Sequence, residues 1–134
     1  MMSTTTVETT DITQIANFLV EQCQNKNFCA VMERFYADNI VSVEPITLQG
    51  QTSPITEGLP AVLAMSQHWE ADNEVHSCTV SQPIITGSHF AVTMQLDVTC
   101  KSMGNARFTM EEIAVYEVQN GKIVRQQFFY STQK

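Results

Sequence analysis

The sequence predicts a single α+β domain in which three helices come first and a curved antiparallel sheet follows. Apolar residues recur with the 3.6-residue period of a helix as far as Trp69, whereas the chain beyond Asn73 alternates with the two-residue period of strands. A chain of 134 residues fits one hydrophobic core, since typical domains have about 100 to 150 residues. We therefore expect one domain over residues 11–134, preceded by a disordered polar tail at residues 1–10.

Three helices are expected, over residues 11–23, 28–36 and 59–69. Asp11 is suited to cap the first helix, because a carboxylate there can accept a hydrogen bond from a backbone N–H that has no partner within the helix. Pro60 is tolerated in the first turn of the third helix, where its missing N–H would have no partner. The first two helices would form an αα-hairpin.

The first strand is expected over residues 40–44, and Pro45 ends it because proline cannot donate to a β-ladder. The polar segment 46–58 is expected to be a loop that could cover the mouth of a pocket. The remaining strands are expected over residues 74–82, 84–86, 90–100, 106–118 and 122–131.

The composition bears on partners and location. Acidic side chains outnumber basic ones by 14 to 7, and the formal charge of −7 opposes binding to nucleic acid or anionic lipid. No apolar run approaches a membrane span and no signal peptide is visible, so we expect a cytoplasmic protein without membrane contact. Only 16% of the residues are charged, which favours a homodimer that covers part of the sheet face.

No cofactor or metal is expected. The four cysteines Cys23, Cys29, Cys78 and Cys100 are irregularly spaced in apolar segments and are expected to be buried thiols. His76 and Cys78 share a strand face, but a zinc site needs further ligands that the spacing does not supply. The isolated glycines offer no cradle for a nucleotide cofactor.

Two motifs carry a resemblance to a known family. The run YADNIVSVEP at residues 36–45 resembles the junction of the second helix and first strand in ketosteroid isomerases. The runs NGKIV at 120–124 and QFFY at 127–130 resemble the final hairpin of SnoaL-like proteins. The order of elements matches over nearly the whole chain. The resemblance implies the NTF2-like fold, a cone-like curved sheet wrapped around the helices, with a pocket for a small apolar or carbonyl-containing ligand.

The resemblance also implies a catalytic base. It places Glu44 at the position of the isomerases' carboxylate base, where burial in an apolar cone would raise its pKa for proton abstraction from carbon. The isomerases also need a tyrosine and a protonated acid to stabilise the enolate. The matching positions fall near Leu19 or Val20 and near Ala114, so steroid-type isomerisation is not expected.

Polar residues in the later strands could replace those donors. Two-residue turns at 103–104 and 120–121 would pair Gln95 with Glu112 and Ala114 with Gln127. Gln95, Asp97, Glu112 and Gln127 would then form one polar cluster. Alternation alone cannot say whether this cluster lines the pocket or faces outward, because one β-bulge exchanges the faces. We expect the cluster to line the pocket.

Two hypotheses follow. In the first, the chain binds a small carbonyl compound and performs cofactor-independent isomerase, cyclase or dehydratase chemistry. Its expected catalytic residues are Glu44, Glu112 and Asp97. Its expected ligand-binding residues are Tyr36, Trp69, Gln95, Gln127 and Phe129. In the second, the missing enolate donors mean that the chain is a non-catalytic dimeric binding or scaffold module.

Overall fold

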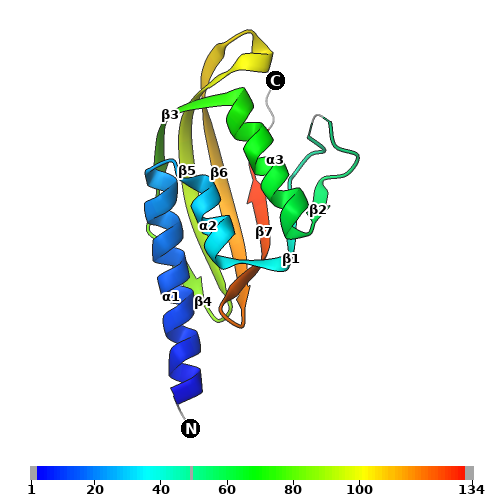
Figure 1. Cartoon of the computed structure of the whole chain (residues 1–134). Helices are drawn as coiled ribbons and strands as arrows, with labels where there is room; N and C mark the ends of the chain where they lie inside the picture. Colours follow the sequence, from blue (N-terminus) through cyan, green and yellow to red (C-terminus); the bar gives the residue numbers. More distant parts are fainter. Residues whose placement is uncertain (1–2, 49, 132–134) are drawn as a thin grey trace.

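The computed structural model describes residues 3–48 and 50–131 (Figure 1). The elements in chain order are α1 (Ser3–Gln24), α2 (Phe28–Phe35), β1 (Tyr36–Val43), β2 (Ile55–Glu57), α3 (Leu59–Asp72), β3 (Asn73–Val80), β4 (Ile84–Thr86), β5 (His89–Cys100), a 3-10 turn η1 (Lys101–Met103), β6 (Ala106–Gln119) and β7 (Lys122–Phe129). The expected succession of helices and strands is confirmed apart from β2, which falls in a segment expected to be loop.

The strands form one mixed sheet in the order β2-β1-β7-β6-β5-β3. The short strand β4 pairs with the first residues of β5. Strands β1 and β7 run parallel, while the other neighbouring pairs are antiparallel. The three helices lie against one face of this curved sheet (Figure 1). The predicted α+β class with a cone-like sheet is therefore confirmed.

The core lies between α1, α2 and the concave face of the sheet. Alternate residues of β5 point inward and are almost fully buried, as are Ile15 and Leu19 of α1. This pattern follows from the two-residue period of a strand, which sends every second side chain to the same face. The buried β5 residues are Phe90, Val92, Met94, Leu96, Val98 and Cys100.

Two predictions about the first half of the chain are wrong. Helix α1 begins at Ser3, so Asp11 lies within the helix, and most of the expected tail is helical backbone. Met1 and Met2 lie outside the described residues. Residues 55–57, expected to be loop, form β2 because they complete an edge ladder with β1. The preceding loop still reaches the interior, through Leu48.

The predicted pairing of the later strands is wrong by one residue at both connections. The two-residue turn Asn120-Gly121 is present, and both residues have the positive φ that such a turn needs. However, a β-bulge at Val124 shifts the ladder, so that Ala114 pairs with Phe128. Between β5 and β6, the chain takes five residues where two were expected, so Glu112 pairs with Met94.

Candidate active site

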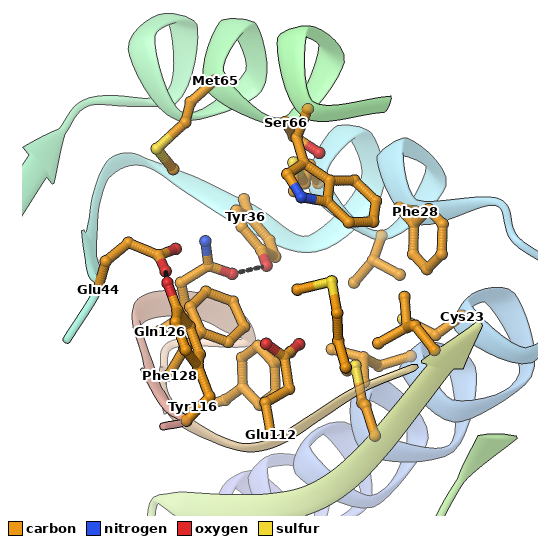
Figure 2. Close-up of a pocket in the computed structure, with 18 of the residues that line it drawn as sticks. Cys23, Phe28, Tyr36, Glu44, Met65, Ser66, Glu112, Tyr116, Gln126 and Phe128 are labelled. Atoms are coloured by element: carbon orange, nitrogen blue, oxygen red, sulfur yellow. Dashed lines mark hydrogen bonds between the residues drawn. The ribbon is translucent and has the colours of Figure 1, made fainter. Parts of the chain in front are cut away.

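A cavity of about 250 Å³ lies between α2, α3 and the concave face of the sheet (Figure 2). Its walls are mainly apolar, aromatic and thioether side chains, as in most small-molecule sites. Two acidic and no basic side chains lie among the described residues that line it. The apolar and aromatic lining residues are Leu19, Cys23, Phe28, Val31, Met32, Tyr36, Leu48, Met65, Trp69, Met94, Leu96, Met110, Tyr116, Phe128 and Tyr130.

Glu112 rises from the floor of this cavity (Figure 2). Its strand neighbours on the same face, Met110 and Ala114, are apolar, because alternation places Glu112 in the inward row of β6. No hydrogen bond or ion pair to its carboxylate is found among the described residues. Burial, reinforced by the nearby negative charge of Glu44, raises the pKa of Glu112 to about 7. This side chain can therefore hold or release a proton near neutral pH.

Glu44 lies directly after β1 and also lines the cavity. The hydroxyl of Tyr130, just beyond the end of β7, donates to Glu44 Oε1 at 2.8 Å (Figure 2). The parallel pairing of β1 and β7 brings these two strand ends together. Burial raises the pKa of Glu44, and the hydrogen bond from Tyr130 opposes that rise by stabilising the carboxylate.

The two carboxyl groups differ in a way that assigns their protons. Glu44 has a hydrogen-bond donor that favours its charged form, whereas Glu112 has none among the described residues. When the pair carries one negative charge, that charge is therefore better placed on Glu44. An ionised Glu44 can accept a proton while a protonated Glu112 can donate a hydrogen bond.

A buried amide network forms another wall of the cavity. The hydroxyl of Tyr36 donates to Gln126 Oε1, and Gln126 Nε2 donates to Ser42 Oγ at 2.8 Å. All three side chains are less than 7% exposed. Ser42 lies opposite Gln126 in the parallel ladder, which explains their contact. The bulge at Val124 turns Gln126 inward, where the expected register would have placed Gln127.

The structure places four of the eight expected site residues at the cavity and the other four on the outward face of the sheet. Glu44, Glu112, Tyr36 and Trp69 line the cavity. The remaining four do not line it, because the register places them in the outward rows of β5 and β7.

The polar cluster proposed from sequence is therefore split. Asp97 accepts two hydrogen bonds from Arg107, at 3.0 and 2.9 Å, and this ion pair keeps the pKa of Asp97 below its ordinary value. Gln95 donates to Glu111 at 2.8 Å. Gln127 accepts a hydrogen bond from Arg125, and Phe129 lines an outer groove. Expecting Gln95, Asp97, Gln127 and Phe129 to line the cavity was wrong, since each connection shifts the register by one residue; Gln95 and Phe129 instead line the outer groove, which Glu112 also borders.

Sequence reasoning did not single out four polar pocket residues, Ser66, Tyr116, Gln126 and Tyr130. Gln126 was passed over because the bulge that turns it inward has no clear sequence signal. Tyr116 stacks on Phe90, with the ring centroids 4.9 Å apart. Tyr130 entered only as the last residue of the run that resembles the final hairpin of SnoaL-like proteins. Its position could have been predicted, because a last strand that pairs in parallel with the first strand ends beside Glu44.

The structure shows four free cysteines, of which Cys29 is only partly buried. Within residues 3–48 and 50–131, no group of three or more His, Cys, Asp or Glu side chains is arranged to hold a metal ion. His76, considered beside Cys78, makes a 2.7 Å hydrogen bond to Thr99. None of the helices described is both long and apolar enough to span a membrane.

Comparison with known proteins identifies the family. The model of the SnoaL-like domain matches residues 9–130. The chain belongs to the SnoaL-like family. A proposed SnoaL-like polyketide cyclase from Mesorhizobium loti is 33% identical, with a TM-score of 0.81 over 89% of this chain and 98% of its own. The resemblance inferred from the sequence is thus confirmed.

More distant structures share the fold of this SnoaL-like domain. A proposed isomerase from Bacillus subtilis is 17% identical and covers 92% of this chain and 88% of its own, with a TM-score of 0.70. A protein with a ketosteroid-isomerase-like fold from Catenulispora acidiphila, in complex with trimethylamine, is 16% identical. It covers 87% of this chain and 85% of its own, with a TM-score of 0.67. No curated protein matches the chain.

Proposed function

We propose that this SnoaL-like protein performs cofactor-independent acid–base chemistry on a small, largely apolar carbonyl compound, of the isomerase or cyclase type. The observation that carries this proposal is the pair of carboxyl groups, Glu44 and Glu112, that face one apolar cavity. Their environments separate their proton affinities, which is how one site obtains a base and an acid from the same side-chain type.

In the proposed step, ionised Glu44 removes a proton from the carbon next to the substrate carbonyl. The electrons of that C–H bond form a C=C bond, and the carbonyl π electrons move to oxygen. Protonated Glu112 donates a hydrogen bond or its proton to this oxygen. Return of a proton to a different carbon completes an isomerisation, whereas attack of the enol carbon on a second carbonyl closes a ring.

Proton abstraction can be measured without knowledge of the natural substrate. α-Tetralone, an aromatic ketone, is incubated with the protein in D₂O, and exchange of its α-hydrogens is followed by proton NMR. Glu44→Gln should reduce enzyme-dependent exchange by about 100-fold or more, the usual contribution of a general base. Glu112→Gln should cost about tenfold, because the amide still donates a hydrogen bond but cannot transfer a proton.

Glu111→Gln is the matched control, because Glu111 is the neighbouring residue on the outward face. It should leave exchange unchanged. If no ketone in a panel of steroids, tetralones and polyketide-like aromatics exchanges above the Glu44→Gln background, the catalytic proposal is abandoned. Tight binding without exchange would favour the non-catalytic binding module.

We also propose that the protein is a cytoplasmic homodimer that pairs through the outward sheet face. Ile113 and Phe129 are neighbours in the ladder there and are 48% and 46% exposed, which is high for large apolar side chains. Sedimentation analysis should find a dimer, and Ile113→Asp should shift it towards monomer. A wild-type monomer at micromolar concentration would contradict this part of the proposal.

A further inference from the structure

Gln126 is held at both ends of its amide. Its Oε1 accepts the Tyr36 hydroxyl hydrogen, and its Nε2 gives one hydrogen to Ser42 at 2.8 Å. A side-chain amide has two N–H donors, so one remains after the contact with Ser42. No acceptor for it is found among the described residues, and Gln126 lines the cavity.

The same network limits what Tyr36 can do. A tyrosine has a single O–H, and here that hydrogen is already donated to Gln126. In this arrangement Tyr36 offers a ligand only oxygen lone pairs, so it cannot stabilise a negatively charged oxygen. The remaining N–H of Gln126 can stabilise such an oxygen by donating a hydrogen bond to it.

The proposed step would gain from a second donor to the substrate oxygen beside Glu112. Glu44 is the proposed base, and the Tyr130 hydroxyl is already donated to it. Gln126 lies on β7, and Figure 2 shows its amide between Glu44 and Tyr36. Glu112 lines the same cavity. A ligand oxygen inside the cavity could therefore meet a fixed N–H as well as the Glu112 carboxyl group.

We infer that Gln126 binds the ligand oxygen through its remaining N–H, and that Tyr36 and Ser42 are positioning residues that hold the amide in place. The inference rests on the proposed function only in taking the ligand to carry a carbonyl or enol oxygen. Fixed donors of this kind favour the charged oxygen of an enolate, because they need no reorganisation as the charge forms.

Binding of 2-naphthol, an enol analogue, and of naphthalene, its counterpart without oxygen, tests this role without requiring turnover. Gln126→Met keeps the length of the side chain and removes the amide. It should weaken 2-naphthol binding about tenfold, the effect of one hydrogen bond, and leave naphthalene binding nearly unchanged. Gln127→Met, the outward neighbour, should change neither affinity.

The positioning residues have their own signature. Tyr36→Phe and Ser42→Ala should each reduce the preference for 2-naphthol over naphthalene by less than Gln126→Met does. If Tyr36→Phe removed that preference and Gln126→Met did not, the amide would have the reverse orientation and Tyr36 would be the donor. Equal losses for both probes in Gln126→Met would show a packing role. Either result overturns the inference.

Because Gln126 is buried, its substitution could also unfold the protein, so one measurement uses the unmodified chain. In ¹⁵N NMR spectra, one of the two Gln126 side-chain amide protons should shift downfield on addition of 2-naphthol but not of naphthalene. The absence of that selective shift contradicts the inference. The shift would support it even if α-tetralone exchange failed, so the two proposals fail separately.

Discussion

Glu111 and Glu112 are neighbours in β6, yet they lie on opposite faces of the sheet in different environments. Glu111 is exposed and accepts a hydrogen bond from Gln95. Glu112 faces a cavity of apolar walls, where burial raises its pKa to about 7. The residue type is the same, so the difference in chemistry comes from the face alone. The following predictions test how far this contrast between the faces extends.

The largest expected difference concerns packing. Phe90 is 1% exposed on the inward face and stacks on Tyr116, whereas Phe129 is 46% exposed on the outward face. Phe90→Ala should lower the free energy of unfolding by about 3 to 5 kcal/mol, because it leaves a cavity in the core. Phe129→Ala, measured in the Ile113→Asp monomer so that the proposed dimer contact does not contribute, should lower it by less than about 1 kcal/mol. Urea denaturation of both variants measures this, and similar losses would contradict the assignment of the faces.

The next effect is on pH-dependent stability. Because the folded state raises the pKa of Glu112 to about 7, the folded protein keeps a proton that the unfolded chain loses near its ordinary value. The wild-type free energy of unfolding should therefore fall as pH rises from about 4.5 to 7, by roughly 2 to 3 kcal/mol. Burial acts on Glu44 in the same direction.

Urea denaturation between pH 4.5 and 8 tests this dependence. Glu112→Gln should flatten most of the decline and be more stable than wild type at pH 8. Glu111→Gln should keep the wild-type slope. A wild-type stability that rises over this interval, or a Glu112→Gln variant with an unchanged slope, would show that the carboxyl group is better hydrated than its surroundings indicate.

A smaller effect is expected from Tyr130→Phe, which removes the hydrogen bond to Glu44. Since this bond opposes the rise caused by burial, its loss should raise the pKa of Glu44 further. The carboxyl ¹³C signal of Glu44, followed through a pH titration, measures the shift directly. Ser131→Ala, at an exposed neighbouring position, serves as the control. A pKa that stays the same or falls in Tyr130→Phe would contradict the role of this hydroxyl.

The smallest effect is expected on the outward face. Asp97→Asn breaks the ion pair with Arg107, which is exposed to solvent. Exposed pairs contribute little, so the melting temperature should hardly change. The α-tetralone exchange rate should also match that of the wild type. A large loss of exchange would restore Asp97 to the catalytic set expected from the sequence.

The sequence was informative wherever a local pattern decides the structure. Alternation in residues 90–100 predicts which side chains of β5 form one face, and all the apolar members of that face are buried. Asn120-Gly121 predicts its turn because few other pairs adopt positive φ at low cost. Glu44 was placed by resemblance to the isomerases, and the structure brings it to the cavity.

The sequence was less informative about which residues of two strands meet. A bulge at Val124 and the five-residue connection after Cys100 each shift a ladder by one position. Such a shift exchanges the two faces, because side chains alternate. Of the four residues of the expected polar cluster, only Glu112 therefore lies in the inward row that lines the cavity. Gln95, Asp97 and Gln127 lie on the outward face. These shifts depend on how the whole sheet curls, and no short motif encodes that curvature.

The parallel pairing of β1 with β7 also has a consequence for how the protein folds. Glu44 and Tyr130 are 86 residues apart in the chain but share a hydrogen bond. Contacts between such distant segments form slowly, because a long loop must close before they gain any energy. The helices and the β5–β6 hairpin can form earlier. Ligand binding should therefore be among the last properties to appear during refolding, later than most of the secondary structure.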